Sequence, residues 1–255
     1  MASKLMVSKG NQLIHAGYTL SISEQRVILL CLAKLDSRQK IPNNYEFSIS
    51  VDDLHNEIGI TRENAYRDLR NAVDSLYNRT IKLDPDEPGT ERRWLYEKAF
   101  FKSDGSVTLF FSPSIIPYIS ELKKRFTTYR LKDVAKFKCS YSIRFYEVLM
   151  QWKDKTELKV EVSWIRGALQ LGDKYPRVSD IKKYVVIPAI NDINNFSNLT
   201  VTFSQVKRGR EVTHFVFNYS ICGVNDNAAI TTTCVENKDK PGGKVWEETK
   251  NRLKN

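Results

Sequence analysis

Apolar residues recur with helical spacing in three stretches of the first half of the chain. In the first stretch, residues 20–34, Ser21 and Glu24 have the spacing of a capping box, in which each side chain accepts a hydrogen bond from a free backbone amide. The second stretch, residues 51–58, is short. The third, residues 62–77, predicts a long amphipathic helix with one apolar face made of Ala65, Leu69, Ala72, Val73 and Leu76.

The capping and turn residues between these stretches predict a helix-turn-helix followed by a hairpin. Gly59 is expected to stop the short helix in a left-handed conformation, and Thr61 is expected to cap the long one. Asp104 and Gly105 supply the positive φ of a tight turn, and a further helix is expected at 113–126. Helix, short helix, turn, long helix and hairpin follow one another in a winged helix. The strands are expected at 45–49, 80–83, 94–101 and 107–111.

The second half of the chain repeats this order. A helix at 142–152, a short helix at 163–171 ended by Gly172 and a long helix at 178–195 are expected. Pro188 removes a backbone hydrogen bond inside the long helix, so we expect a kink there or a second helix that begins at the proline. Strands are expected at 158–162, 199–205 and 212–219, with a turn at 207–210.

A short internal similarity supports a duplication. Residues 72–78, AVDSLYN, lie opposite residues 189–195, AINDINN, and each stretch ends a long helix and leads into a β-branched strand. The expected fold class is therefore α+β, with two tandem winged-helix domains. We expect an N-terminal winged helix at 1–125, a C-terminal winged helix at 126–222 and a flexible tail at 223–255, which has few large apolar residues.

The net charge of +10 is confined to one part of the chain. Residues 1–122 carry 15 basic and 16 acidic residues, residues 123–222 carry 19 and 9, and residues 223–255 carry 6 and 5. Solubility alone does not require such an asymmetry. A polyanion that binds the second unit explains it, and double-stranded DNA is the natural partner of a winged helix.

Basic residues of the second unit cluster where a winged helix meets DNA. Some precede or begin the long helix, which enters the major groove, and others occupy the wing tip, where they reach phosphates. Ser179 and Asp180 could cap the helix or touch base edges, and the cap is the simpler interpretation. Binding through this many cations predicts a steep dependence on salt. The DNA-binding candidates are Lys174, Tyr175, Arg177, Ser179, Lys182, Lys183, Lys207, Arg208 and Arg210.

The first unit offers weaker candidates. Glu63 and Asp68 reduce the net positive charge of its long helix. A role in protein–protein contact therefore fits the surface of this helix as well as DNA binding does. Basic residues near the join between the units, Lys123–Arg125, Arg130, Lys132, Lys136 and Lys138, fit a solvated face or a DNA contact equally well. The candidates on the long helix are Arg62, Asn64, Arg67 and Arg70.

Signatures of enzymes and membrane proteins are missing. The sequence has neither a GxxxxGK[ST] phosphate-binding loop nor a GxSxG nucleophile motif. Its three histidines are isolated, and its four cysteines are widely spaced without a CxxC, which indicates reduced thiols. No apolar run approaches the roughly 18 residues of a transmembrane helix, and the N-terminus lacks a signal-peptide core. We expect a cytoplasmic protein with no catalytic activity, cofactor or metal.

Three stretches resemble the iteron-binding plasmid replication initiators, or Rep proteins. They are residues 20–30, LSISEQRVILL, residues 64–69, NAYRDL, and residues 184–195 with the later KRGR at 207–210. The similarity covers about residues 5–220 and does not include the tail. It implies a bacterial protein that binds repeated origin sites as a monomer and represses its own promoter as a homodimer on an inverted repeat. It also implies recruitment of host helicase machinery, groove contacts by Lys182 and Lys183, and backbone contacts by Lys207, Arg208 and Arg210.

Two alternatives remain beside a replication initiator. A chromosomal transcription regulator would bind a single palindrome, whereas an initiator gene lies beside directly repeated elements. A nicking enzyme of rolling-circle replication would cleave a DNA strand in the presence of a divalent metal.

Overall fold

The computed structural model describes residues 5–41, 46–84, 87, 89–101 and 104–222 of the 255-residue chain. The expected tail at 223–255 lies outside the described residues, and so does Tyr45, the first residue of the strand expected at 45–49.

The described part of the first unit contains three helices, a short helical pair and a hairpin. Strand β3 and the unexpected strand β4 form a small sheet of their own. The elements are β1 (Met6–Gly10), α1 (Asn11–His15), α2 (Ile22–Ala33), β2 (Glu46–Ser50), α3 (Val51–Asp53), the π-helical η1 (Leu54–Ile58), α4 (Arg62–Leu76), β3 (Thr80–Lys82), β4 (Glu91–Arg93), β5 (Leu95–Phe101), β6 (Ser106–Phe111) and the 3-10 turn η2 (Ile116–Tyr118).

The second unit repeats that order. The strand before the short helix pairs with the last strand in both units, which gives the sheets β2-β6-β5 and β8-β10-β9. The elements are β7 (Phe126–Arg130), the 3-10 turn η3 (Leu131–Asp133), α5 (Ser140–Gln151), β8 (Glu157–Glu161), α6 (Val162–Ala168), α7 (Val178–Ile181), the π-helical η4 (Lys182–Val186), α8 (Ile187–Phe196), β9 (Leu199–Arg208) and β10 (Glu211–Ile221).

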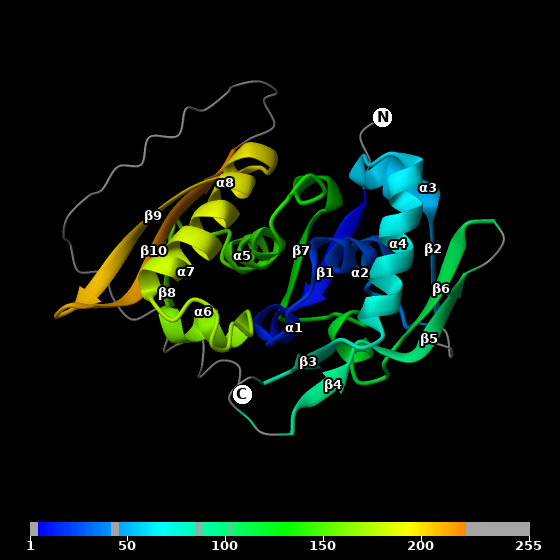
Figure 1. Cartoon of the computed structure of the whole chain (residues 1–255), viewed down its shortest axis with the longest axis horizontal. Helices are drawn as coiled ribbons and strands as arrows, with labels where there is room; N and C mark the ends of the chain where they lie inside the picture. The colour runs from blue at the N-terminus through cyan, green and yellow to red at the C-terminus, as the bar shows by residue number, and fades with distance from the viewer. Residues whose placement is uncertain (1–4, 42–45, 85–86, 88, 102–103, 223–255) are drawn as a thin grey trace.

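An antiparallel pair, β1 with β7, joins the two units. Ser8 lies opposite Thr128, and their hydroxyl oxygens are 2.8 Å apart. In Figure 1 this pair lies between α4 on one side of the molecule and the α7–α8 helix on the other. Each unit therefore begins with one strand of a shared pair, and the repeat extends further towards the N-terminus than the sequence similarity indicated.

Local signals in the first unit predict the local structure well. Ser21 and Glu24 form both hydrogen bonds of the capping box at the start of α2. Gly59 has a φ of 81° and follows the last residue of η1. Thr61 precedes α4, but its side chain makes no capping hydrogen bond, so that part of the prediction is wrong. The expected apolar face of α4 is buried, namely Ala65, Leu69, Ala72, Val73 and Leu76.

The helix expected at 113–126 is wrong. Only η2 is helical there, and Phe126 already begins β7. Pro117 lacks the amide hydrogen that a helix starting at Pro113 would need at its fifth residue. Glu121 and Arg125 adopt positive φ values of 52° and 55°, which a helix does not allow.

Pro188 interrupts the long helix by a π-turn. The backbone remains helical at Val186 and Ile187, and the amide of Ile187 donates to the carbonyl of Lys182, five residues earlier. The expected interruption is therefore one helical turn that contains an extra residue. Its i→i−5 hydrogen bond compensates in part for the backbone hydrogen bond that the proline cannot make.

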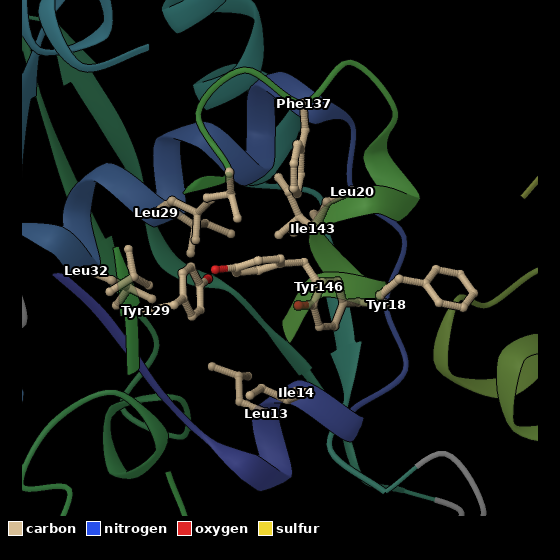
Figure 2. Packing of buried hydrophobic residues seen from close by; sticks show 14 of the residues in the cluster. Leu13, Ile14, Tyr18, Leu20, Leu29, Leu32, Tyr129, Phe137, Ile143 and Tyr146 are labelled. Carbon is tan, nitrogen blue, oxygen red and sulfur yellow. The ribbon is translucent and has the colours of Figure 1, made fainter. Parts of the chain in front are cut away.

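The buried core is continuous across the two units. Leu29 and Leu32 of α2 face the same interior as Ile143 and Tyr146 of α5, and Tyr129 of β7 lies among them (Figure 2). The rings of Tyr129 and Tyr146 meet edge to face with their centroids 5.4 Å apart. In β10, Phe215, Phe217 and Tyr219 are buried.

Candidate nucleic-acid interface

The turn between α6 and α7 is held by one arginine. Arg166 of α6 donates from Nη2 to the carbonyl oxygens of Tyr175 at 2.7 Å and Pro176 at 3.0 Å, and from Nη1 to that of Lys174 at 3.4 Å. Tyr175 has a φ of 57°, a left-handed conformation that is unusual for a residue with a side chain. The clamp therefore fixes a strained turn that exposes Lys174 and Arg177 to solvent.

The second recognition helix, which runs from α7 through η4 into α8, presents Ser179, Lys183 and Tyr184 to solvent. The residue that precedes α7 is Arg177, and no side chain caps the helix, so the expected cap by Ser179 or Asp180 is wrong. Lys182 is half-buried, with its ammonium 5.9 Å from the ring centre of Phe203 in β9, and so lies towards the wing.

An aromatic pair lies beside the exposed lysine of this helix. The rings of Tyr175 and Tyr184 stack with their centroids 5.6 Å apart and an interplanar angle of 21°. The ammonium of Lys183 is 4.9 Å from the Tyr184 ring centre. The Tyr184 residue is 47% exposed, so its ring is accessible beside the ammonium of Lys183.

The wing is the hairpin of β9 and β10. Lys207 pairs with Val212 and Arg208 with Glu211, so the strands reach closer to the tip than expected. Gly209 closes the turn with a φ of 64°. Lys207, Arg208 and Arg210 are all exposed at this tip.

The basic residues of the turn, the exposed face of the recognition helix and the wing form no ion pairs with acidic side chains. Within the described part of the chain, no ion pair involves Lys174, Arg177, Lys183 or the three basic residues of the wing. Turn, helix and wing thus carry an uncompensated positive field, as a surface for phosphate does.

The first recognition helix, α4, is different because its charges are paired within the chain. Arg62 forms an ion pair with Asp52. Arg67 donates to the side-chain oxygen of Asn64 at 2.7 Å and lies 4.0 Å from Asp68. Arg70 is exposed. All four candidates of α4 reach solvent, but two of the arginines already have anionic partners.

The basic residues near the join fall into separate places. Lys123, Lys124 and Arg125 are exposed in the loop before β7. Arg130 is bound to Asp133 at 2.8 Å. Lys132, Lys136 and Lys138 are exposed between β7 and α5, and the ammonium of Lys138 lies 5.7 Å from the Phe196 ring centre.

Sequence reasoning missed two residues of this surface. Arg166 carries no sequence signal, because the carbonyls that it binds are eight to ten residues away in a turn of unknown shape. Tyr184 could have been found, because it follows two lysines and stands one residue before the buried pair Val185 and Val186.

Other chemistry is not visible on the described residues. No three His, Cys, Asp or Glu side chains among them gather closely enough to hold a metal ion. Within the same residues, none of the helices is long and apolar enough to cross a membrane. His15 is buried against Trp164, and His214 lies 3.8 Å from Glu161.

Two helix-turn-helix units with hairpin wings, arranged in tandem around a shared strand pair, define a tandem winged-helix protein. The family described as "Initiator Replication protein, WH1" matches residues 6–150, and the one described as "Initiator Rep protein, WH2" matches residues 161–219. The chain belongs to this family of replication initiator proteins. The expected family and the expected α+β fold of two tandem winged helices are therefore confirmed.

Individual relatives agree with this assignment. A "Replication initiation protein" of Escherichia coli is 31% identical over 229 residues, which cover 86% of this chain and 71% of that protein. The "PI protein" of Escherichia coli is 25% identical, over 96% of this chain and 94% of its own length. A crystal structure of "Pi initiator protein in complex with iteron DNA" has the same fold, with a TM-score of 0.73 at 22% identity over 88% of this chain and all of that one.

Proposed function

We propose that this initiator binds double-stranded DNA mainly through its second winged helix. The observation that carries the proposal is the difference in charge pairing, since the turn, recognition helix and wing of the second unit have no acidic partners among the described residues while Arg62 and Arg67 of α4 do. The long helix enters the major groove, with Ser179, Lys182 and Lys183 near its start. Lys174, Tyr175, Arg177, Lys207, Arg208 and Arg210 contact the backbone.

The DNA sites are repeated elements of a plasmid origin, the iterons, which the chain binds as a monomer. Family membership supports this role, and so does the crystal structure of the related Pi initiator, which was determined in complex with iteron DNA. A homodimer represses the initiator's own promoter at an inverted repeat, and host helicase machinery is recruited to the origin. A transcription regulator without an origin role has no support from the comparisons.

The two units have different roles in dimerisation and DNA binding. The unit at 1–125 contributes the dimer interface and secondary DNA contacts through Arg62, Asn64, Arg67 and Arg70, and the unit at 126–222 supplies most of the affinity. The boundary before Phe126 is supported by the repeat, because β7 begins the second unit as β1 begins the first.

A paired substitution tests the dominance of the second unit. The probe is a duplex that carries one repeat, mapped by footprinting the protein on the DNA beside its gene. Lys182→Ala with Lys183→Ala should weaken binding to this footprinted repeat far more than Arg62→Ala with Arg67→Ala, as measured by gel shift. A salt titration should show the slope of the affinity falling by about one for each phosphate contact that is lost. Equal losses from the two double variants would contradict the proposal.

The initiator has no strand-cleaving activity of its own and acts in the bacterial cytoplasm. Incubation of supercoiled origin DNA with the protein and Mg²⁺ or Mn²⁺ should leave the DNA covalently closed. Nicked product that increases with protein concentration, and that persists after the protein is purified further, would contradict this part of the proposal.

A further inference from the structure

Two arginines occupy the same place in the two units. Arg26 is the fifth residue of α2, and Arg144 is the fifth residue of α5. Helices α2 and α5 hold equivalent positions in the repeat, and the strands that precede them, β1 and β7, pair with each other. The two side chains are therefore related by the same repeat that relates the winged helices.

Each arginine reaches across the junction into the other unit. Arg26 donates from Nη2 to the carbonyl oxygen of Phe137 at 3.0 Å and to that of Ala135 at 3.4 Å, in the segment that leads into α5. Arg144 donates from Nη2 to the carbonyl oxygen of Ala16 at 2.6 Å, in the segment that leads into α2. The contacts are reciprocal, since an arginine of α2 binds the backbone before α5 and an arginine of α5 binds the backbone before α2.

The surroundings of Arg144 fit a fixed clamp. Its side chain is 4% exposed, and its guanidinium lies 3.6 Å from the ring centre of Tyr18 in the first unit. A planar guanidinium can stack on a ring and donate to a carbonyl at once, which the ammonium of a lysine does less well.

The charge of Arg26 is influenced by carboxylates on both recognition helices. Burial lowers the pKa of Arg26, and the carboxylates of Asp68 on α4 and Asp192 on α8 oppose that shift. One guanidinium thus interacts with both long helices as well as with the segment before α5.

We propose that Arg26 and Arg144 are positioning residues that fix the separation and rotation of α4 relative to the α7–α8 helix, and so set the spacing of the two DNA segments that one chain binds. The inference rests on the proposed function, because it requires both winged helices to contact one duplex. Each base pair inserted between those segments moves them by about 3.4 Å and rotates them by about 34°, so a fixed pair of helices tolerates little change.

The test compares spacing preference rather than affinity. The probes are a duplex with one footprinted repeat and duplexes with one, two or five base pairs inserted at its midpoint. For the unsubstituted protein, two inserted base pairs should weaken binding by about 100-fold, because the contacts of one helix to its bases are lost. Arg26→Ala and Arg144→Lys, separately and together, should reduce this ratio to about tenfold or less.

The ratio isolates positioning from folding. Both affinities come from the same preparation, so a merely structural role, which lowers the fraction of folded protein, would lower both affinities equally and leave their ratio unchanged. Arg38→Ala removes an exposed cation that pairs locally with Asp36, and this control should keep the original ratio. An unchanged ratio in the Arg26 and Arg144 variants would overturn the inference. If the unsubstituted protein shows no spacing dependence, the proposed two-domain binding fails instead.

Discussion

Asp192 of the second recognition helix caps helix α5, since its Oδ2 accepts a hydrogen bond from the hydroxyl of Ser142 at 2.8 Å. The same oxygen accepts from the backbone amides of Lys138 at 2.8 Å and Cys139 at 2.7 Å. Helix α5 has no cap from its own preceding residue. A residue of α8 therefore binds the two residues that precede α5 and a side chain of its first turn, and fixes the two helices to each other.

Replacement of this carboxylate should destabilise the fold. Asp192→Asn removes the charge from an acceptor of three hydrogen bonds, one buried and two part-buried, and we expect the free energy of unfolding to fall by about 1–3 kcal/mol. Urea unfolding followed by circular dichroism measures the change. Asn191→Ala, an exposed neighbour on the same helix, should change it by less than about 0.5 kcal/mol. Identical urea midpoints for Asp192→Asn and the unsubstituted protein would refute the capping role.

Removal of the Arg166 clamp should reduce DNA affinity more than stability. The three carbonyls that it binds lie in a solvent-exposed turn, so water can replace the guanidinium and the stability cost should stay near 1 kcal/mol. The turn loses its fixed shape, and we expect Arg166→Ala to bind the footprinted duplex about tenfold more weakly, equivalent to about 1.4 kcal/mol. Gel shift beside urea unfolding checks both values. Ser163→Ala in the same helix is the control. A loss of stability as large as the loss of binding would contradict the prediction.

Burial of His15 should make stability fall as the pH is lowered. Desolvation lowers the pKa of His15 from 6.5 to about 4 in the folded protein. Above pH 6.5 the imidazole is neutral in both states, so it has no effect on the pH dependence. Between pH 6.5 and 4 only the unfolded state takes up the proton, and stability should fall by up to about 3 kcal/mol.

Urea unfolding at several pH values isolates this contribution. The difference between the unsubstituted protein and His15→Phe should change steadily from pH 7 to pH 4, because the variant lacks the titrating group while the other histidines are common to both. A constant difference across that range would show that His15 does not carry the effect.

The buried pair of Lys9 and Glu147 should tolerate joint replacement better than single replacement. Their side chains are 4% and 0% exposed, the ammonium lies 2.6 Å from the carboxylate, and the hydroxyl of Tyr129 donates to the same oxygen at 2.5 Å. Lys9→Met leaves a buried carboxylate without its cation, and we expect a loss of about 3–5 kcal/mol. Lys9→Met with Glu147→Met should recover part of that loss. A double-mutant cycle in urea measures the coupling, and strictly additive losses would refute it.

The sequence predicted those elements whose causes are local. Helix α2 follows from its capping box, and α4 follows from five apolar residues at helical spacing that are all buried. Strand β7 was not expected, because the partner that turns Phe126–Arg130 into a strand is β1, at the other end of the first unit. Local periodicity contains no information about such a partner.

The spacing of apolar residues in the sequence already indicates the π-turn. Ile181, Val185, Ala189 and Ile193 are all fully buried at strict intervals of four residues. In an α-helix, a residue four positions further along lies about 40° further around the axis. Four residues at intervals of four would therefore not share one face. An extra residue in one turn brings them back into line, and Pro188 favours its position there.

The amino-acid sequence by itself determined the helices, the repeat of two winged helices and the place of the positive charge, because capping, periodicity and composition act over a few residues. Only the tertiary structure decided which cations are compensated, how Arg166 shapes the turn, and how Arg26 and Arg144 cross the junction. Each of these depends on a partner far away in the chain, and distance in space is set by the packing of the whole core rather than by neighbours in the sequence.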